Sequence, residues 1–357
     1  MELFRQNVQP PGERPEATDV EKEEAERTHV QRLTKIFQDS WEENRKEGDP
    51  DVSFTLYFAG HGRAEDVHPN LRKELQEADI FMPEDIFWTE QVVRNHNKEA
   101  KGEDVFAPLL SRYNIALRNA MRESGVVVEL PDIPADFPDA KEQRAALSNA
   151  SRERWHLPFD EAVDDFDTAT RNVATATRAR EHEILGNIPA CIRKALDENK
   201  DLRKRQSLKV VMTYGGAHTS IYHALDRAGA NVERHKRHDG SVVYGHSSEL
   251  LRNYVLGAAG SAPDRELAAR GLTDLIFLNA IAPIIEGGVK DETLDELTRV
   301  ARLFNERFTI EELRDLWDTY RVHKDRSVIL AKLNEKGLHI PKTREELDEL
   351  LQSNRKP

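Results

Sequence analysis

The stretch VVMTYGGAH, residues 210–218, runs from apolar residues directly into two glycines and a histidine. Its apolar part lacks polar alternation, which is typical of a strand buried on both faces of a parallel sheet. A helical pattern follows it through Leu225. This order predicts a strand, a turn and a helix, in which Gly215 and Gly216 let the backbone approach a ligand closely.

Other apolar segments repeat this arrangement. Strands are predicted from 52 to the break at Gly60 and over 79–84, 126–128 and 230–235, and helical patterns occupy 18–46 and 160–199. Strands that alternate with helices predict an α/β fold with a mainly parallel sheet flanked by helices. The four prolines within 131–158 predict an irregular excursion over this body.

We expect three regions along the chain. Residues 1–17 contain three prolines and predict a flexible leader, 18–246 form the α/β core domain with an N-terminal helix, and 247–357 form a helical subdomain. No catalytic constellation stands out in the helical subdomain, so we expect it to serve as packing or as a surface for homo-oligomerisation.

Composition excludes several classes of function. The net charge of −13 opposes binding to a nucleic-acid backbone, which requires a dense basic surface. The single cysteine, Cys191, excludes an intramolecular disulfide and favours a reducing compartment. No apolar run reaches the roughly 18 residues of a membrane span, and the start lacks the apolar segment of a signal peptide. The sequence therefore predicts a cytoplasmic protein with no membrane or nucleic-acid partner.

Polar residues follow four of the predicted strands. Because parallel strands end at one edge of a sheet, these residues are expected to meet there. They are His61, Arg63, Glu84, Glu129, Gly215, Gly216 and His218.

These residue types suit hydrolysis by two routes. A divalent metal of unknown identity held by His61, Glu84 and His218 could activate water, or a histidine could act as the general base. The alternatives are a capping role for His218, solvated acids at 84 and 129, and an ordinary salt bridge for Arg63. Gly215 and Gly216 could also cradle a phosphate, although the stretch lacks the lysine of a phosphate-binding loop.

The remaining histidines and the cysteine have weaker claims to a site. We interpret His68 as a surface residue, and His96 stands alone among polar residues. His235 lies beside arginine and lysine, which would repel a cation. Cys191, on a predicted helix, is expected to be a small buried hydrophobe rather than a nucleophile.

Two motifs carry a resemblance to a known superfamily. Gly215-x-x-His218 is similar to a recurring glycine–histidine motif, and Arg180-Glu181-x-x-Ile184-x-x-Asn187 is similar to an arginine-led helix. Over residues 52–236 the chain thereby resembles the TraB/Tiki, erythromycin esterase and ChaN-like superfamily. Its first motif departs from the pattern, because the expected histidine position holds Arg63 and the histidine, His61, directly follows Gly60.

The resemblance implies a site at the carboxyl ends of the strands. It also implies hydrolysis, with metal-dependent peptidases in the Tiki branch and ester cleavage in the esterase branch, whereas other relatives bind haem or regulate pheromone. The leading hypothesis is a hydrolase acting on a small-molecule or peptide substrate, with His61, Glu84, Glu129 and His218 as catalytic residues. Arg63, Arg180, Gly215 and Gly216 would bind the substrate. The alternative is a non-enzymatic ligand-binding or regulatory protein on the same fold.

Overall fold

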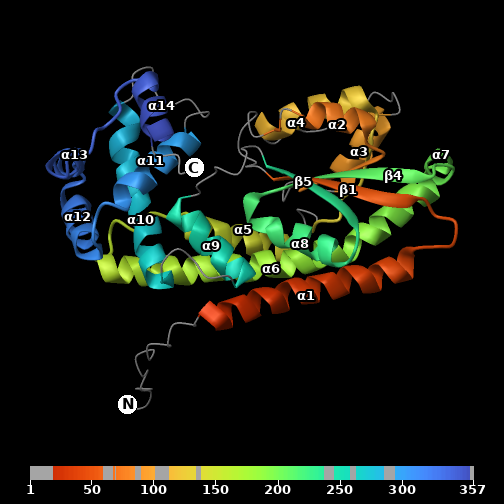
Figure 1. Cartoon of the computed structure of the whole chain (residues 1–357), viewed down its shortest axis with the longest axis horizontal. Coiled ribbons are helices and arrows are strands. Elements are labelled where there is room, and N and C mark those ends of the chain that lie inside the picture. The colour runs from red at the N-terminus through yellow and green to blue at the C-terminus, as the bar shows by residue number, and fades with distance from the viewer. Residues whose placement is uncertain are drawn as a thin grey trace, which may run out of the picture.

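A five-stranded parallel sheet forms the centre of the computed structural model (Figure 1). The model describes residues 19–58, 67–68, 70–84, 90–100, 112–133, 138–236, 245–257, 263–284 and 294–353. The strand order is β3-β2-β4-β1-β5, and every pair is parallel. The predicted α/β fold with a parallel sheet is therefore confirmed. The strands are β1 (Asp51–Phe58), β2 (Ile80–Pro83), β3 (Val127–Val128), β4 (Ser207–Tyr214) and β5 (Asn231–Lys236).

Strand β4 occupies the middle of the sheet, which explains the successive apolar residues 210–212. Val210 and Met212 pack into the hydrophobic core on one face, and Val211 packs into the core on the other. Side chains alternate along a strand, so a strand that is covered on both faces needs apolar residues at successive positions.

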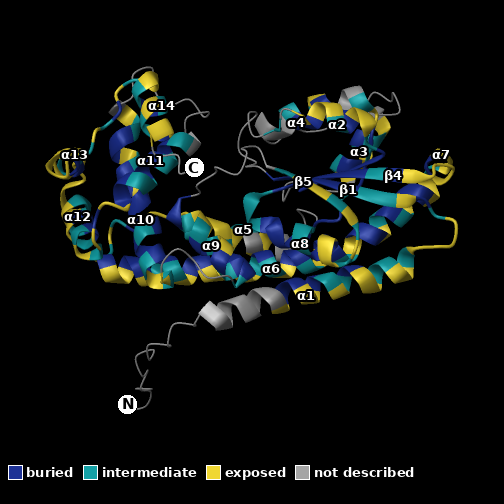
Figure 2. Ribbon diagram, in the orientation of Figure 1, coloured by how far each residue is buried: buried dark blue, intermediate teal, exposed yellow. Residues whose placement is uncertain are grey.

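Helices cover both faces of the sheet. One face carries α2 (Leu71–Glu77), α3 (Glu90–Ala100) and α4 (Arg112–Ser124), and the other carries α1 (Asp19–Asn44), α6 (Phe159–Glu198) and α8 (Thr219–Arg227) (Figure 1). The buried side chains of α1 include Val30, Leu33 and Phe37, which recur at helical spacing. Figure 2 shows the same separation, with buried residues along the strands and on the inward helix faces.

The long helix α6 belongs to two hydrophobic cores. Ile184, Leu185 and Ile188 pack beneath the sheet, whereas Phe159 and Phe166 pack among the C-terminal helices. The helical region thus draws on residues far before position 247. The C-terminal helices are α9 (His246–Leu256), α10 (Asp264–Ile281), α11 (Leu294–Asn305), α12 (Ile310–His323), α13 (Arg326–Glu335) and α14 (Arg344–Ser353), with a short 3₁₀ turn, η3 (Ala282–Ile284).

The irregular excursion predicted over 131–158 is wrong in its central part. Residues Pro138–Ala150 form the helix α5, which packs on α6. Proline at the first position of a helix costs little, because the first backbone N–H groups have no partner within the helix. The prolines therefore marked where a helix begins rather than the absence of one. A single-turn helix, α7 (Lys200–Arg203), follows α6.

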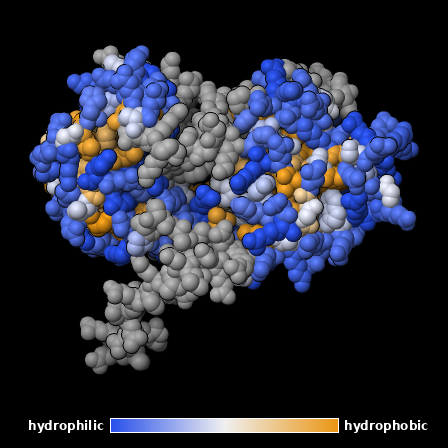
Figure 3. Space-filling view, in the orientation of Figure 1, coloured by the Kyte–Doolittle hydropathy of each residue, from blue (hydrophilic) through white to orange (hydrophobic). Residues whose placement is uncertain are grey.

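The described surface is largely polar on the face drawn in Figure 3. This agrees with a composition of 33% charged residues. Among the described residues, no helix combines the length and the apolar character that crossing a membrane requires.

The connections that leave β1 and β4 diverge. After β1 the chain passes to α2 on one face and returns to β2, beyond β4. After β4 it passes to α8 on the other face and returns to β5, beyond β1. Neighbouring strands with diverging connections leave a crevice at the carboxyl edge of the sheet, where α/β proteins bind ligands. In Figure 1 this edge faces the C-terminal helical region.

Candidate functional site

Glu84 is the centre of a charged cluster at the carboxyl edge. It directly follows β2, and its backbone N–H donates to the Thr213 carbonyl at 2.8 Å. Its carboxylate accepts hydrogen bonds from the Gly215 N–H and lies 2.8 Å from Arg180 Nη1 and 3.0 Å from His218 Nε2. The structure therefore brings together Glu84, Arg180, Gly215 and His218, four of the residues predicted for the site.

His218 lies between two carboxylates. It ends the 3₁₀ turn η2 (Gly216–His218), and its Nδ1 is 3.2 Å from Glu181 Oε1 while its Nε2 faces Glu84. Burial opposes a charge on this ring, but the nearby Glu84 carboxylate and the hydrogen bonds with Glu181 and Glu84 raise the pKa of His218 to about 9. The imidazole is consequently a cation at neutral pH, with both nitrogens occupied as donors.

Glu181 supports this cation from α6. It is 0% exposed, and it accepts hydrogen bonds from His218, from Ser220 and, at 2.9 Å, from His29 Nε2 on α1. Burial would favour its neutral form, yet the hydrogen bonds from His218, His29 and Ser220 lower the pKa of Glu181. Sequence reasoning noted Glu181 only within the arginine-led motif and overlooked His29, which lies about 150 residues away on another helix.

Arg180 joins the cluster to a further acid, Asp132. Its guanidinium donates from two nitrogens to the two Asp132 oxygens, with Nε 2.7 Å from Oδ1. Burial would lower the pKa of Arg180, but Asp132 and Glu84 raise it, so the side chain is fully charged. Asp132 was not predicted, because it follows the two-residue strand β3 within a proline-rich segment. We refer to Glu84, Asp132, Arg180, Glu181 and His218 as the charged cluster.

Glu129 was predicted to lie with Glu84, but its described contact is elsewhere. One carboxylate oxygen is 2.8 Å from Lys194 Nζ on α6, and the other has no partner among the described residues. Burial raises the pKa of Glu129, and Lys194 opposes that effect. Glu129 follows β3 as expected, yet within the described chain it forms a separate ion pair with α6.

Four buried hydroxyls lie close to the ends of β1 and β4 without a partner among the described residues. They belong to Tyr57, Thr213, Tyr214 and Thr219. Burial chiefly, with the Asp132 and Glu84 carboxylates, raises the pKa of Tyr214 well above its usual range, so the phenol stays neutral. Buried hydroxyls normally form hydrogen bonds, and a concentration of unpartnered ones at a ligand-binding edge is a functional signal.

Two histidines that had weaker claims to a site from the sequence lie against the ring of Tyr57, which carries one of these hydroxyls. Tyr57 stacks on His235 with ring centroids 4.9 Å apart, and the His68 ring lies tilted against Tyr57 with a centroid distance of 4.7 Å. His68 and His235 are both half-buried. His68, interpreted from the sequence as a surface residue, is half-buried because the end of β1 brings the Tyr57 ring against it.

The glycines of the opening stretch adopt ordinary backbone angles. Gly215 has φ −65° and ψ 155°, and neither Gly215 nor Gly216 is in the left-handed region. The contact that distinguishes Gly215 is the hydrogen bond from its N–H to the Glu84 carboxylate. Its role in the structure is thus to hold an acid of the charged cluster.

Two predicted site residues, His61 and Arg63, lie outside the described residues. Among the residues that are described, no group of three or more His, Cys, Asp or Glu side chains could hold a metal ion. In their present arrangement Glu84 and His218 use their polar atoms on each other and on their neighbours. These two residues do not fit a metal ion as they stand, and a site that includes His61 stays a prediction.

The helical region contains a second buried polar network that sequence reasoning missed. His246 Nδ1 lies 3.0 Å from Asp274 Oδ1, and its Nε2 faces Glu306 at 3.6 Å. Asn305 donates to Asp274 at 2.9 Å. The Asp274 carboxylate also accepts from the backbone N–H of His246 at 2.8 Å, which satisfies a donor at the start of α9. This network joins α9, α10 and α11, and we interpret it as a structural network that holds these helices together.

Cys191 behaves as predicted. It is half-buried on α6 beside the core, and burial raises the pKa of its thiol to about 12. A thiol with that pKa is a poor nucleophile.

Comparisons of the chain with protein-family models, with curated proteins and with solved structures found no match.

Proposed function

We propose that the chain is a hydrolase of the TraB/Tiki and erythromycin-esterase-like type, in which water attacks an ester or amide at the carboxyl edge of the sheet. One observation carries the proposal. The carboxyl edge, where the connections of β1 and β4 pass to opposite faces, is the place where buried charges from α6, η2 and the segments after β2 and β3 converge. Burying ionic groups is costly, and such clusters concentrate at functional sites.

The geometry favours a positioning role for His218. An imidazolium that donates to Glu84 and Glu181 has no lone pair with which to accept a proton. In this proposal Arg180 and His218 fix the Glu84 carboxylate. This carboxylate also accepts a hydrogen bond from the N–H of Gly215, directly after β4. His61, which follows the neighbouring strand β1 in sequence, is the proposed general base, and Arg63 is the proposed ligand for an anionic or carbonyl oxygen.

Unpartnered hydroxyls support a polar substrate at this edge. Tyr57 and Thr213 are paired in register on neighbouring strands, and their side chains face the same side of the sheet. A substrate oxygen or nitrogen that reached them would supply the hydrogen bonds that these groups lack. The arrangement suits a small-molecule or peptide substrate with several polar groups.

The test is hydrolysis of ester and peptide libraries by the purified protein and by single variants. His61→Ala should abolish turnover because it removes the proposed general base, and Glu84→Gln should reduce it at least about 100-fold because Glu84 holds Arg180 and His218 at the site. Glu335→Gln, an exposed acid on α13, is the matched control and should leave the rate unchanged. Full activity in both His61→Ala and Glu84→Gln would overturn the mechanism.

A second candidate is a non-enzymatic ligand-binding or regulatory protein on the same fold. The observation that favours it is that Glu84 contacts both Arg180 and His218, and His218 also contacts Glu181. Their polar atoms are engaged with one another, so these residues are not arranged to exchange a proton with a substrate. A compound that raises the melting temperature and survives incubation unchanged would support this candidate. Turnover of that compound would support the hydrolase.

The proposal includes a possible metal ion, an oligomeric state and a location. A divalent metal would require His61 together with a rearranged Glu84 and His218, and elemental analysis of the purified protein tests it. A homo-oligomer through the C-terminal helices is tested by the molar mass in solution. The proposed location is the cytoplasm, because the lone Cys191 suits a reducing compartment.

A further inference from the structure

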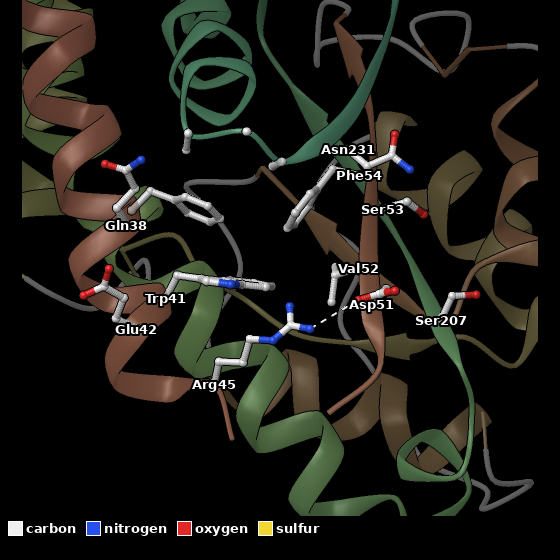
Figure 4. A pocket seen from close by; sticks show the side chains of 14 residues that line it. Gln38, Trp41, Glu42, Arg45, Asp51, Val52, Ser53, Phe54, Ser207 and Asn231 are labelled. Atoms are coloured by element: carbon white, nitrogen blue, oxygen red, sulfur yellow. Dashed lines mark hydrogen bonds and ion pairs between the residues drawn. The ribbon is translucent and has the colours of Figure 1, made fainter. Parts of the chain in front are cut away.

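A cavity lies at the edge of the sheet opposite the charged cluster, where β1 and β4 begin. It has a volume of about 670 Å³ and lies between α1, residues 51–54 of β1, Ser207 and the turn 228–231 that precedes β5 (Figure 4). Pockets of roughly 300–1,000 Å³ accommodate small molecules. Phe58 at the carboxyl edge lies six positions after Val52 on β1, which corresponds to about 20 Å, so the two sites are distinct.

Three aromatic side chains form the apolar side of this cavity. Phe37 and Trp41 lie one helical turn apart on α1, with ring centroids separated by 5.4 Å. Phe54 of β1 meets Trp41 edge-on at 6.4 Å. Figure 4 shows the Trp41 ring reaching from α1 toward β1, with Phe54 beside it. The cavity thus has a rigid apolar wall contributed by two elements.

Neutral hydrogen-bonding groups form the polar side. The side chains of Gln38, Ser207 and Asn231 line the cavity, and none of them is hydrogen-bonded to another described residue. The Trp41 indole N–H likewise has no acceptor in the described part of the chain. The turn leaves room for a ligand, because a Cβ added at Gly229 would meet no atom within 4 Å.

The charges around the cavity disfavour an anionic ligand. Arg45 is the positively charged residue that lines it, and its guanidinium is 3.3 Å from Asp51 and also lies over the Trp41 ring. Glu42 adds a second carboxylate to the lining. A phosphate or carboxylate would meet more negative than positive charge here, whereas a hydroxyl could donate to either acid.

We propose that this cavity binds a neutral saccharide ring. A pyranose presents an apolar C–H face and an edge of hydroxyls, which match the aromatic wall and the surrounding amide, hydroxyl and carboxylate groups. The saccharide ring takes the place of the Arg45 guanidinium over the Trp41 ring, whose other face stacks on Phe37, and Gln38 and Asn231 exchange hydrogen bonds with the ring hydroxyls. The site is independent of the hydrolase proposal, since it shares none of the residues assigned to the reaction.

The experiment is calorimetric titration of the full chain with a panel of neutral mono- and disaccharides, with nucleosides and sugar phosphates as separate arms. One saccharide should bind at one site per chain with a Kd of about 1 mM or tighter. The double variant Gln38→Ala/Asn231→Ala changes only exposed side chains and should weaken binding at least about tenfold, as should Trp41→Ala.

Controls separate this site from the carboxyl edge. Gln352→Ala alters an exposed amide on α14, and His218→Gln alters the charged cluster; both should bind the saccharide as wild type does. The proposal is overturned if no saccharide binds at roughly 10 mM, if the double variant binds unchanged, or if nucleosides or sugar phosphates bind in place of saccharides. Loss of binding in His218→Gln alone, in a variant whose circular dichroism spectrum shows it folded, would relocate the sugar to the charged cluster and would also overturn it.

Discussion

Raising the pH from 7 to 8.5 should destabilise this protein through His218. The pKa of His218 in the folded chain is raised from the ordinary value of 6.5 to about 9, against burial, by Glu84 and Glu181. At about 1.4 kcal/mol per tenfold change in proton affinity, that difference is worth roughly 3 kcal/mol. Because the folded pKa is the higher one, this stabilisation is complete below about pH 6.5 and is lost as the pH rises through about 9.

About half of the loss falls between pH 7 and pH 8.5, where His246, whose pKa is raised against burial by Asp274 and Glu306, contributes in the same direction. Between pH 7 and pH 8.5 the free energy of unfolding should fall by about 2 kcal/mol, measured by urea denaturation at constant ionic strength. His218→Gln keeps a hydrogen-bond donor but has no proton to lose, so its unfolding free energy should fall by about 2 kcal/mol less than that of the wild type over that range. His156→Gln, an exposed histidine away from the charged cluster, should behave as wild type.

Two results would refute this reasoning. A wild-type protein whose unfolding free energy stays constant from pH 7 to 8.5 would show that His218 is not held as a cation. An equal fall in wild type and His218→Gln would assign the pH dependence to other groups. If His218→Gln fails to fold, the titration of the His218 ring in the wild-type protein, followed by NMR, decides the matter, and a midpoint near 6.5 would contradict the prediction.

Further predictions concern stability. Glu181→Gln should lower the free energy of unfolding by about 3 kcal/mol because it leaves a buried imidazolium with one carboxylate, whereas the exposed Glu335→Gln should change it by less than about 0.5 kcal/mol; equal effects would argue against the cluster. Thr309→Ala removes the capping box of α12 and should cost about 1 kcal/mol, visible as a lower melting temperature. The neighbouring imidazole and guanidinium lower the pKa of Glu306 to about 2, so its stabilisation is present above about pH 4.5 and is lost as the pH falls toward 2. Glu306→Gln should flatten that part of the acid-unfolding curve, and an unchanged curve would contradict the assignment.

Much of the fold could be predicted because local patterns agree with it. Every predicted strand is present, including β4, whose successive apolar residues reflect burial on both faces. The segment over 131–158 was misinterpreted for a local reason, since proline excludes a helix interior but is tolerated at a helix start such as Pro138. Patterns of composition alone do not separate these two cases.

The candidate site could be predicted only in part. Glu84 and His218 each follow a strand, so the rule for parallel sheets placed them at one edge, and their contact at 3.0 Å agrees with that expectation. Glu129 obeys the same rule but pairs with Lys194, because the direction of a side chain depends on the helix that lies beneath it. His29 had no signal of this kind, since it lies on a helix face.

The sequence by itself determined which segments are strands, that the sheet is parallel, and that polar residues gather at its carboxyl edge, because hydrophobic periodicity and strand ends are local properties. Only the tertiary structure decided which charges meet. His218 is a cation because Glu84 from β2 and Glu181 from α6 both reach it, and Arg180 is held because Asp132 arrives from beyond β3. The protonation state of a buried ring depends on neighbours that are distant in the chain, and no spacing in the sequence encodes those distances.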